Sequence, residues 1–131
     1  MPIQSYRDLI VWQKSMDLVT LVYKLTKDFP KDELYGLTSQ MRRSAASIPS
    51  NISEGSRRST RKEFRRFLCI AYSSGAELET QLEIAIRLEY GNLVFIQEAQ
   101  NLLTEIMKML NKMTYSLKPA VSVNYSLPTT H

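Results

Sequence analysis

The chain has 131 residues, 44% of them hydrophobic and 23% charged, a composition typical of one globular domain with its own core. Its single cysteine, Cys69, excludes an internal disulfide framework, and no apolar run approaches the roughly 20 residues that span a bilayer. The formal net charge is only +4, and we expect a single cytoplasmic domain with neither a secretion signal nor a membrane segment.

The first expected helix starts at Ser5, which forms a capping-box pattern with Asp8, and ends at Phe29 before Pro30. Apolar residues recur along it at helical spacing on two neighbouring faces. The first face holds Leu9, Trp12, Met16, Val19 and Tyr23, and the second holds Val11, Leu18, Val22, Leu25 and Phe29. Such a wide apolar surface predicts contact with two or more helices, or with another subunit.

The second expected helix has Asp32 as its N-cap and Gly55 as its C-terminal stop. Pro49 falls inside it and cannot donate to the carbonyl of Ala45, so the sequence predicts a kink or an early end near Ile48. Nearby polar side chains are expected to satisfy the freed groups, and they are Ser50, Asn51 and Ser53. The apolar face of this helix consists of Leu34, Leu37, Met41, Ala45, Ile48 and Ile52.

The third expected helix starts with a capping box at Thr60 and Glu63 and ends at Gly91, and the fourth runs from its cap Asn92 toward Pro119. Both carry apolar seams that alternate between spacings of four and three. The seams are Phe64, Leu68, Ala71, Gly75, Leu78, Leu82 and Ala85, then Ala99, Leu103, Ile106, Leu110 and Met113. No segment alternates between apolar and polar residues as a strand does.

Four helices joined by short loops must fold back on one another. The sequence therefore predicts an all-α, antiparallel up-down-up-down four-helix bundle over residues 1–116, with the second helix kinked or ended near Pro49. Residues 117–131 are rich in Pro, Ser and Thr, and we expect them to form a flexible C-terminal tail.

Side chains for catalysis or metal binding are scarce. The one histidine, His131, stands in the expected tail, and a di-iron bundle needs a Glu-x-x-His motif on two of its helices. The acidic residues Glu77, Glu79 and Glu83 therefore lack the partners of such a site. We expect no enzymatic activity, no cofactor and no metal.

The glutamates of the third helix have a simpler interpretation. They form an acidic surface, or they pair with Arg42 and Arg43 on the neighbouring helix. Either arrangement is ordinary for a charged helix face in solvent.

Positive charge gathers between residues 42 and 66, which hold eight cations and only two carboxylates, Glu54 and Glu63. Along the third expected helix they form two adjacent rows in which cations repeat every four residues. One row is Arg57, Arg61 and Arg65, and the other is Arg58, Lys62 and Arg66. Cations in a first turn oppose the helix dipole, so stability alone does not account for them. We predict that all eight contact nucleic acid through its phosphates: Arg42, Arg43, Arg57, Arg58, Arg61, Lys62, Arg65 and Arg66.

Two other interpretations of the basic stretch remain open. It could be a solvated charged face, or a surface that binds acidic side chains of a protein partner. Phe64 and Phe67 fall at core spacing, so we expect them inside the bundle and not stacked on bases. Nucleic-acid binding would then depend on backbone charge, with strong salt dependence and little sequence preference.

Several sequence runs resemble a known family. They are LYGLTSQMRRSA at residues 34–45, SIPSNISEG at 47–55 and ELETQL at 77–82, together with VWQK at 11–14 and Phe29-Pro30. Together they resemble the four-helix-bundle proteins encoded in intervening sequences of large-subunit ribosomal RNA genes of some bacteria. Related bundles are the accessory variability proteins of diversity-generating retroelements.

The resemblance implies a homopentamer of bundles around a central channel, with a basic surface that meets nucleic acid or a reverse transcriptase. It covers roughly residues 5–115 and includes Arg42, Arg43 and the basic residues from Arg57 to Arg66. Our leading hypothesis is therefore a non-catalytic, oligomeric module that associates with RNA. The alternative hypothesis is a protein-interaction scaffold for an acidic partner.

Overall fold

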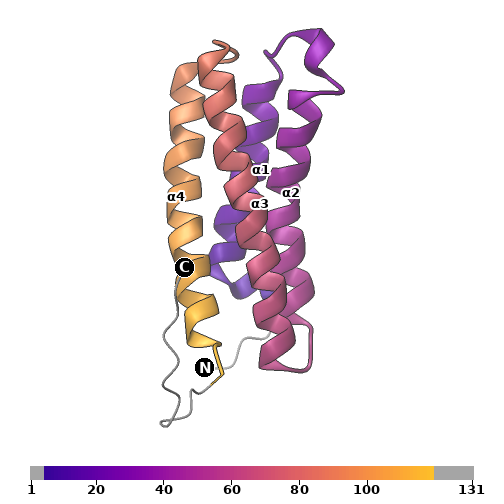
Figure 1. Cartoon of the computed structure of the whole chain (residues 1–131), viewed down its shortest axis with the longest axis vertical. Helices are drawn as coiled ribbons and strands as arrows, with labels where there is room; N and C mark the ends of the chain where they lie inside the picture. The colour runs from indigo at the N-terminus through magenta and orange to yellow at the C-terminus, as the bar shows by residue number, and fades with distance from the viewer. Residues whose placement is uncertain (1–4, 120–131) are drawn as a thin grey trace, which may run out of the picture.

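The computed structural model describes residues 5–119, and all regular structure within that range is helical. Four long helices, α1 (Ile10–Thr26), α2 (Leu37–Ser56), α3 (Arg61–Arg87) and α4 (Leu93–Ser116), are accompanied by two short 3₁₀ turns, η1 (Tyr6–Asp8) and η2 (Lys31–Glu33). Consecutive helices are joined at alternate ends of an elongated bundle (Figure 1). The expected all-α four-helix bundle is confirmed.

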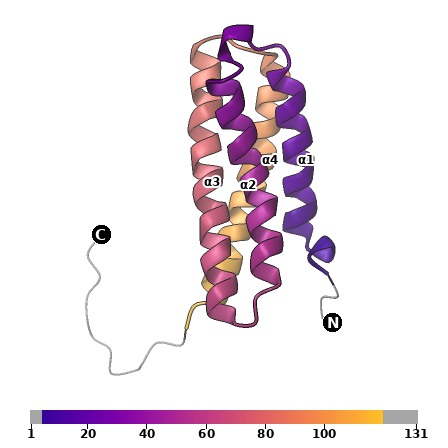
Figure 2. The ribbon, with the colours of Figure 1, turned by 90° about the vertical axis from the view of Figure 1, so that its right-hand side faces the viewer.

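Each long helix packs against two neighbours, since α1 and α3 both contact α2 and α4 (Figure 2). The seams predicted for α3 and α4 form much of the core, with Leu68, Leu78, Leu103 and Ile106 almost completely buried. Only the residues at the seam ends, Phe64 and Met113, are half-buried. The 4-3 spacing therefore identified the buried faces of both helices correctly.

The two apolar faces of α1 have different environments. The face with Val11, Leu18 and Val22 is buried in the bundle core, whereas Met16 and Tyr23 on the other face are 41% and 44% exposed. The bundle therefore buries one face fully and covers the other only in part, because Leu9, Trp12 and Val19 pack against the core while Met16 and Tyr23 stay exposed.

The ends of α1 differ from the prediction. Ser5 caps η1 by accepting a hydrogen bond from the backbone N–H of Arg7, at 3.1 Å, and does not cap α1. Leu9 is extended, so the chain leaves η1 and starts α1 at Ile10. The helix ends at Thr26, and Phe29 beyond it is buried in the core as a loop residue. The capping box thus organised a short turn and not the long helix.

The N-terminus of α2 depends on Glu33 and not on Asp32, which lies within η2. One carboxylate oxygen of Glu33 accepts the backbone N–H of Leu37 at 3.1 Å, and the other accepts the hydroxyl of Tyr90 at 3.1 Å. That hydrogen bond, together with burial and the charges of Glu33 and Asp32, raises the pKa of Tyr90 above its ordinary value of 10.0. A single carboxylate thus connects the start of α2 to the turn between α3 and α4.

Pro49 does not end α2, which continues as an α-helix to Ser56, so the early end near Ile48 is wrong. The expected side-chain donors also act elsewhere. Ser50 donates to the carbonyl of Ala46, and Asn51 donates to that of Ser47, both at 2.8 Å. Neither bonds to the carbonyl of Ala45, the one that proline deprives of a donor.

Gly55 was expected to end α2, but it lies inside the helix and is buried. A Cβ atom at this position would stand 2.6 Å from Cβ of Phe67 and 3.1 Å from the ring of Phe64. The glycine therefore allows α2 and α3 to approach closely. This packing role could not be predicted when the glycine was interpreted as the end of a helix.

The expected tail begins beyond α4. Its first residue, Leu117, packs against the core, and its backbone N–H bonds to the carbonyl of Met113 at 3.1 Å. Residues 120–131, including His131, lie outside the described residues.

Candidate nucleic-acid interface

The basic residues are positioned by the start of α3. Thr60 is extended, and its hydroxyl accepts the backbone N–H of Glu63 at 3.1 Å, as the capping pattern predicts. The helix therefore begins at Arg61, and its first two turns present Arg61, Lys62, Arg65 and Arg66 at the end of the bundle where α4 finishes.

Arg42 and Arg43 are not part of this group. They lie near the start of α2, and fifteen residues of helix separate Arg42 from Arg57, a distance of roughly 22 Å along the axis. Arg42 donates its Nε–H to the hydroxyl of Thr26 at 3.0 Å and lies 4.5 Å from the centre of the Tyr23 ring. The eight cations therefore do not form one surface, because the length of α2 places the other six at the opposite end of the bundle.

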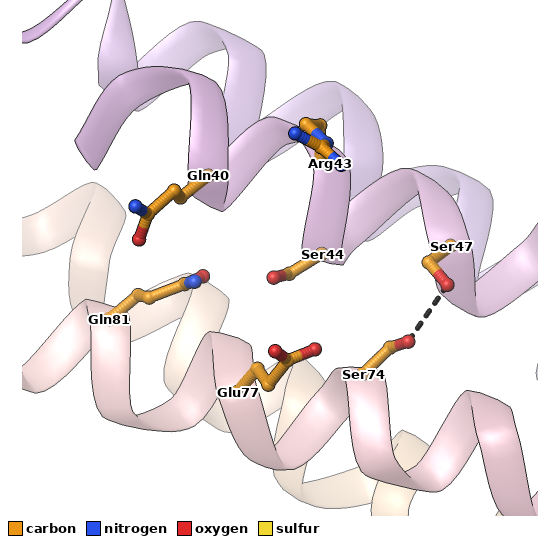
Figure 3. Close-up of a pocket in the computed structure, with 7 residues that line it drawn as sticks. All are labelled: Gln40, Arg43, Ser44, Ser47, Ser74, Glu77 and Gln81. Carbon is orange, nitrogen blue, oxygen red and sulfur yellow. Dashed lines mark hydrogen bonds between the residues drawn. The ribbon is translucent and has the colours of Figure 1, made fainter. Parts of the chain in front are cut away.

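Arg43 borders a polar groove of about 420 Å³ between α2 and α3. Figure 3 shows Gln40 and Ser44 of α2 facing Gln81 and Glu77 of α3 across this groove. The side-chain oxygen of Gln81 is buried there without a hydrogen-bond partner.

The expected pairing of Arg42 and Arg43 with Glu77, Glu79 or Glu83 does not occur in the described part of the chain. Its ion pairs are Lys14–Glu105, Arg58–Glu54 and Arg66–Glu63. Glu77, Glu79 and Glu83 are all exposed, which fits the acidic surface that was the other interpretation.

Two arginines at the start of α3 bond to the end of α4. Arg61 donates from Nη2 to the carbonyl of Ser116 at 2.9 Å, and Arg65 donates from Nε to the carbonyl of Thr114 at 3.0 Å. The last carbonyls of a helix lack partners within it, and its C-terminus carries partial negative charge. Both hydrogen bonds favour the folded bundle and offset part of the unfavourable dipole and like-charge interactions of a basic first turn.

Arg61 and Arg65 bond to backbone carbonyls and not to carboxylates, and this difference decides whether their charge is compensated. A backbone carbonyl is neutral, and within residues 5–119 neither Arg61 nor Arg65 forms an ion pair with a carboxylate, so both are held in place with their charge uncompensated. Arg58 and Arg66 are different, because each pairs with a carboxylate on its own helix or turn, Glu54 or Glu63. The charge at this end of the bundle therefore comes mainly from Arg57, Lys62 and the two carbonyl-anchored arginines.

Aromatic rings near the basic residues at the start of α3 have arginine side chains over them. The guanidinium carbons of Arg58 and Arg66 lie 4.8 and 5.3 Å from the centre of the Phe67 ring, and that of Arg57 lies 5.1 Å from the centre of Tyr6. Phe67 is half-buried and not fully inside as expected. Because arginine side chains lie over the Phe67 ring, little of its surface is free to stack on a base.

A pocket of about 830 Å³ lies between the first turns of α3 and the segment that follows α4. Lys118 borders it together with Arg61, Lys62 and Arg65. The sequence analysis missed Lys118 because it assigned this residue to the tail. The only signal that could have found it is the antiparallel pairing of α3 and α4, which brings the end of one to the start of the other.

Within residues 5–119 there is no group of three or more His, Cys, Asp or Glu side chains arranged to hold a metal ion. None of the helices in this range combines the length and apolarity needed to cross a bilayer.

Fold and charge together define a helical-bundle protein with a cationic end. A family model described as "23S rRNA-intervening sequence protein" matches residues 7–112. The chain belongs to this family, as the resemblance in its sequence predicted. Proteins with curated descriptions give no match.

A solved structure supports the same assignment. It is a crystal structure from Bacteroides thetaiotaomicron, described as a protein with unknown function from the S23 ribosomal protein family. The two chains are 30% identical, with a TM-score of 0.72, and the similarity covers 80% of this chain and 98% of the other.

Proposed function

We propose that this protein is a non-catalytic module that associates with RNA through the cations at the α3 start. The observation that carries the proposal is the anchoring of Arg61 and Arg65 on backbone carbonyls, at 2.9 and 3.0 Å. These arginines keep their positive charge in a fixed position, as phosphate recognition requires. The name of the family, which refers to 23S rRNA, supports RNA as the polyanion.

The geometry favours contacts with phosphates over contacts with bases. Arg57, Arg58, Lys62 and Arg66 are exposed, while the nearby Phe67 ring is covered by guanidinium groups. RNA binding would release counterions and weaken steeply with salt. We expect Arg42 and Arg43 to contribute less, because they lie at a separate site and Arg42 is held by Thr26 and Tyr23.

A salt series with a structured ribosomal RNA fragment tests the proposal. The variant Arg57→Gln/Arg58→Gln/Lys62→Gln removes three exposed cations without touching the two arginines that hold α4. The matched control Lys27→Gln/Lys31→Gln/Arg87→Gln removes three exposed cations from the opposite end of the bundle.

The first variant should bind more weakly, and its log–log salt slope should flatten by about 2 to 3. The control should keep a slope near that of the original protein. Equal binding by both variants, or no RNA binding by the original protein, would refute the proposal.

We also propose that the protein is an oligomer, a homopentamer by resemblance, in which the exposed face of α1 contacts another copy. Met16 and Tyr23 on this face are each more than 40% exposed, although their helical spacing is that of a buried surface. Light scattering should give several times the monomer mass, and Met16→Glu/Tyr23→Glu should reduce it. A monomer at micromolar concentration would contradict this part of the proposal.

The alternative partner is an acidic protein, with a reverse transcriptase as the candidate from the resemblance. A pull-down from lysate with and without nuclease treatment separates the two cases. Loss of all partners after digestion supports RNA. A protein that remains bound after digestion, and is lost with the three-cation variant, supports the scaffold instead.

A further inference from the structure

The pocket at the cationic end is bordered on two sides. One side is the start of α3, and the other is the segment after α4 with Leu117, Lys118 and Pro119. Its volume of about 830 Å³ lies within the range of small-ligand sites. It is therefore a recess in which a group can be held from several directions, and not a flat charged face.

Charge in this recess is strongly unbalanced. Among the described residues, five cations border it, against the single carboxylate of Glu63, which lies 3.8 Å from Arg66. The cations are Arg61, Lys62, Arg65, Arg66 and Lys118. A ligand that carries one negative charge would leave most of this charge uncompensated, so the recess favours a more highly charged anion.

The two anchored arginines still have donors to offer. A guanidinium has five N–H groups, and Arg61 and Arg65 each use one of them on a carbonyl of α4. The carbonyls fix each fork in place, so less side-chain entropy is lost when an anion binds. The arrangement fits an anion with several acceptor oxygens.

Internal and terminal phosphates of RNA differ in charge and in how many sides are attached to the strand. An internal phosphodiester carries one negative charge and is attached to chain on both sides, so the strand would have to enter and leave the recess. A terminal phosphate is a monoester with a charge of about −1.5 to −2 and three acceptor oxygens, and only one side of it is attached to the strand. The second kind matches both the charge and the geometry.

We propose that this recess binds the terminal phosphate of an RNA strand in preference to internal phosphates. This inference rests on the proposed function and narrows it to strand ends. Arg61 and Arg65 supply fixed donors, and Lys62 and Lys118 close over the phosphate from the two sides of the recess.

The test compares one RNA sequence prepared with hydroxyl groups at both ends, with a 5′-phosphate, and with a 3′-phosphate. Binding is measured by fluorescence anisotropy at one salt concentration, with the full chain. At least one phosphorylated form should bind roughly fivefold more tightly than the hydroxyl form, whereas the added charge of about −1.5 to −2 on a long polyanion should by itself change affinity less than about twofold.

A matched pair of variants locates the effect. Lys62→Gln/Lys118→Gln should lose the preference for the phosphorylated end, so that its affinities for the phosphorylated and hydroxyl forms become equal, both lowered by the loss of two cations. Lys27→Gln/Lys31→Gln, which removes the same charge at the other end of the bundle, should keep the preference. All four lysines are exposed, so circular dichroism should show both variants folded.

Three other outcomes would overturn the inference, and one of them would overturn the proposed function as well. Equal affinity for the three RNA forms would overturn the inference and leave the proposed function standing. Binding of none of them would overturn both. A preference that survives in Lys62→Gln/Lys118→Gln, whether or not the other variant keeps it, would move the site away from this recess and so overturn the inference.

Discussion

Arg65 reaches across the end of the bundle and donates its Nε–H to the backbone carbonyl of Thr114, 3.0 Å away. Forty-nine residues separate them in sequence. The bond joins the second turn of α3 to the last turn of α4, where carbonyls would otherwise need water. A side chain that looks like a surface cation in the sequence is therefore part of the scaffold.

Replacing this side chain should destabilise the fold. Arg65→Ala removes a charge-assisted hydrogen bond and a favourable interaction with the α4 dipole, so we expect a loss of about 1–2 kcal/mol in the free energy of unfolding. Urea denaturation followed by circular dichroism measures it. The exposed neighbour Arg66 is the control, and Arg66→Ala should stay within about 0.5 kcal/mol of the original. Equal effects of the two would contradict the structural role of Arg65.

Gly55→Ala should also destabilise the protein, although alanine favours helix by about 1 kcal/mol over glycine. The new Cβ would lie 2.6 Å from Cβ of Phe67, so α2 and α3 must move apart. We expect a net loss of about 1–3 kcal/mol from this overpacking, measured by urea denaturation. Ser50→Ala, at an exposed position on the same helix, should be nearly neutral. An increase in stability for Gly55→Ala would show that the helices can separate freely.

Pro49→Ala should stabilise α2. A proline inside a helix costs about 3 kcal/mol, and alanine restores the bond to the carbonyl of Ala45. Part of this gain is lost because Pro49 is buried and alanine fills less space. We expect a net gain of about 1 kcal/mol in thermal or urea unfolding. A clear loss would mean that the ring packing of Pro49 outweighs the missing hydrogen bond.

Tyr90 should make the stability fall at alkaline pH. Its neutral hydroxyl donates to Glu33, and ionisation would replace this bond with repulsion between two negative charges. Because the pKa of Tyr90 is higher in the folded protein than its ordinary value of 10.0, its contribution is present below pH 10 and is lost as the pH rises through the folded value.

The comparison of Tyr90→Phe with the original protein isolates this contribution. The difference in unfolding free energy between the two should shrink above pH 10, because the variant has no group to ionise there. Tyr115→Phe is the control for loss of a tyrosine hydroxyl, since Tyr115 is 73% exposed. A difference that stays constant up to pH 11 would contradict the assignment.

The periodic apolar residues made the fold predictable. The seams of α3 and α4 depend on local spacing, and spacing is preserved when helices pack. Helix ends were less predictable, because Ser5 and Asp32 are both good caps in isolation and both lie in short turns that precede the real helix starts. The role of Gly55 was also not predictable from local sequence, because it depends on the contact with Phe67 on another helix.

The candidate site was only partly predictable for a related reason. Sequence proximity grouped Arg42 with Arg57, but a helix of this length places them at opposite ends of one rod. The pairing of Arg61 with Ser116 depends on a contact across 55 residues, and Lys118 joins the site only through the same contact. Local charge counts contain no information about such long-range neighbours.

The anchoring of Arg61 and Arg65 on α4 has a consequence for how homologues should diverge. A descendant that no longer met any polyanion would still need both arginines to hold its helices together, whereas Lys62 and Lys118 would be released from selection. Retained lysines at these two positions, more than retained arginines, would then distinguish the lineages that still bind a phosphorylated ligand.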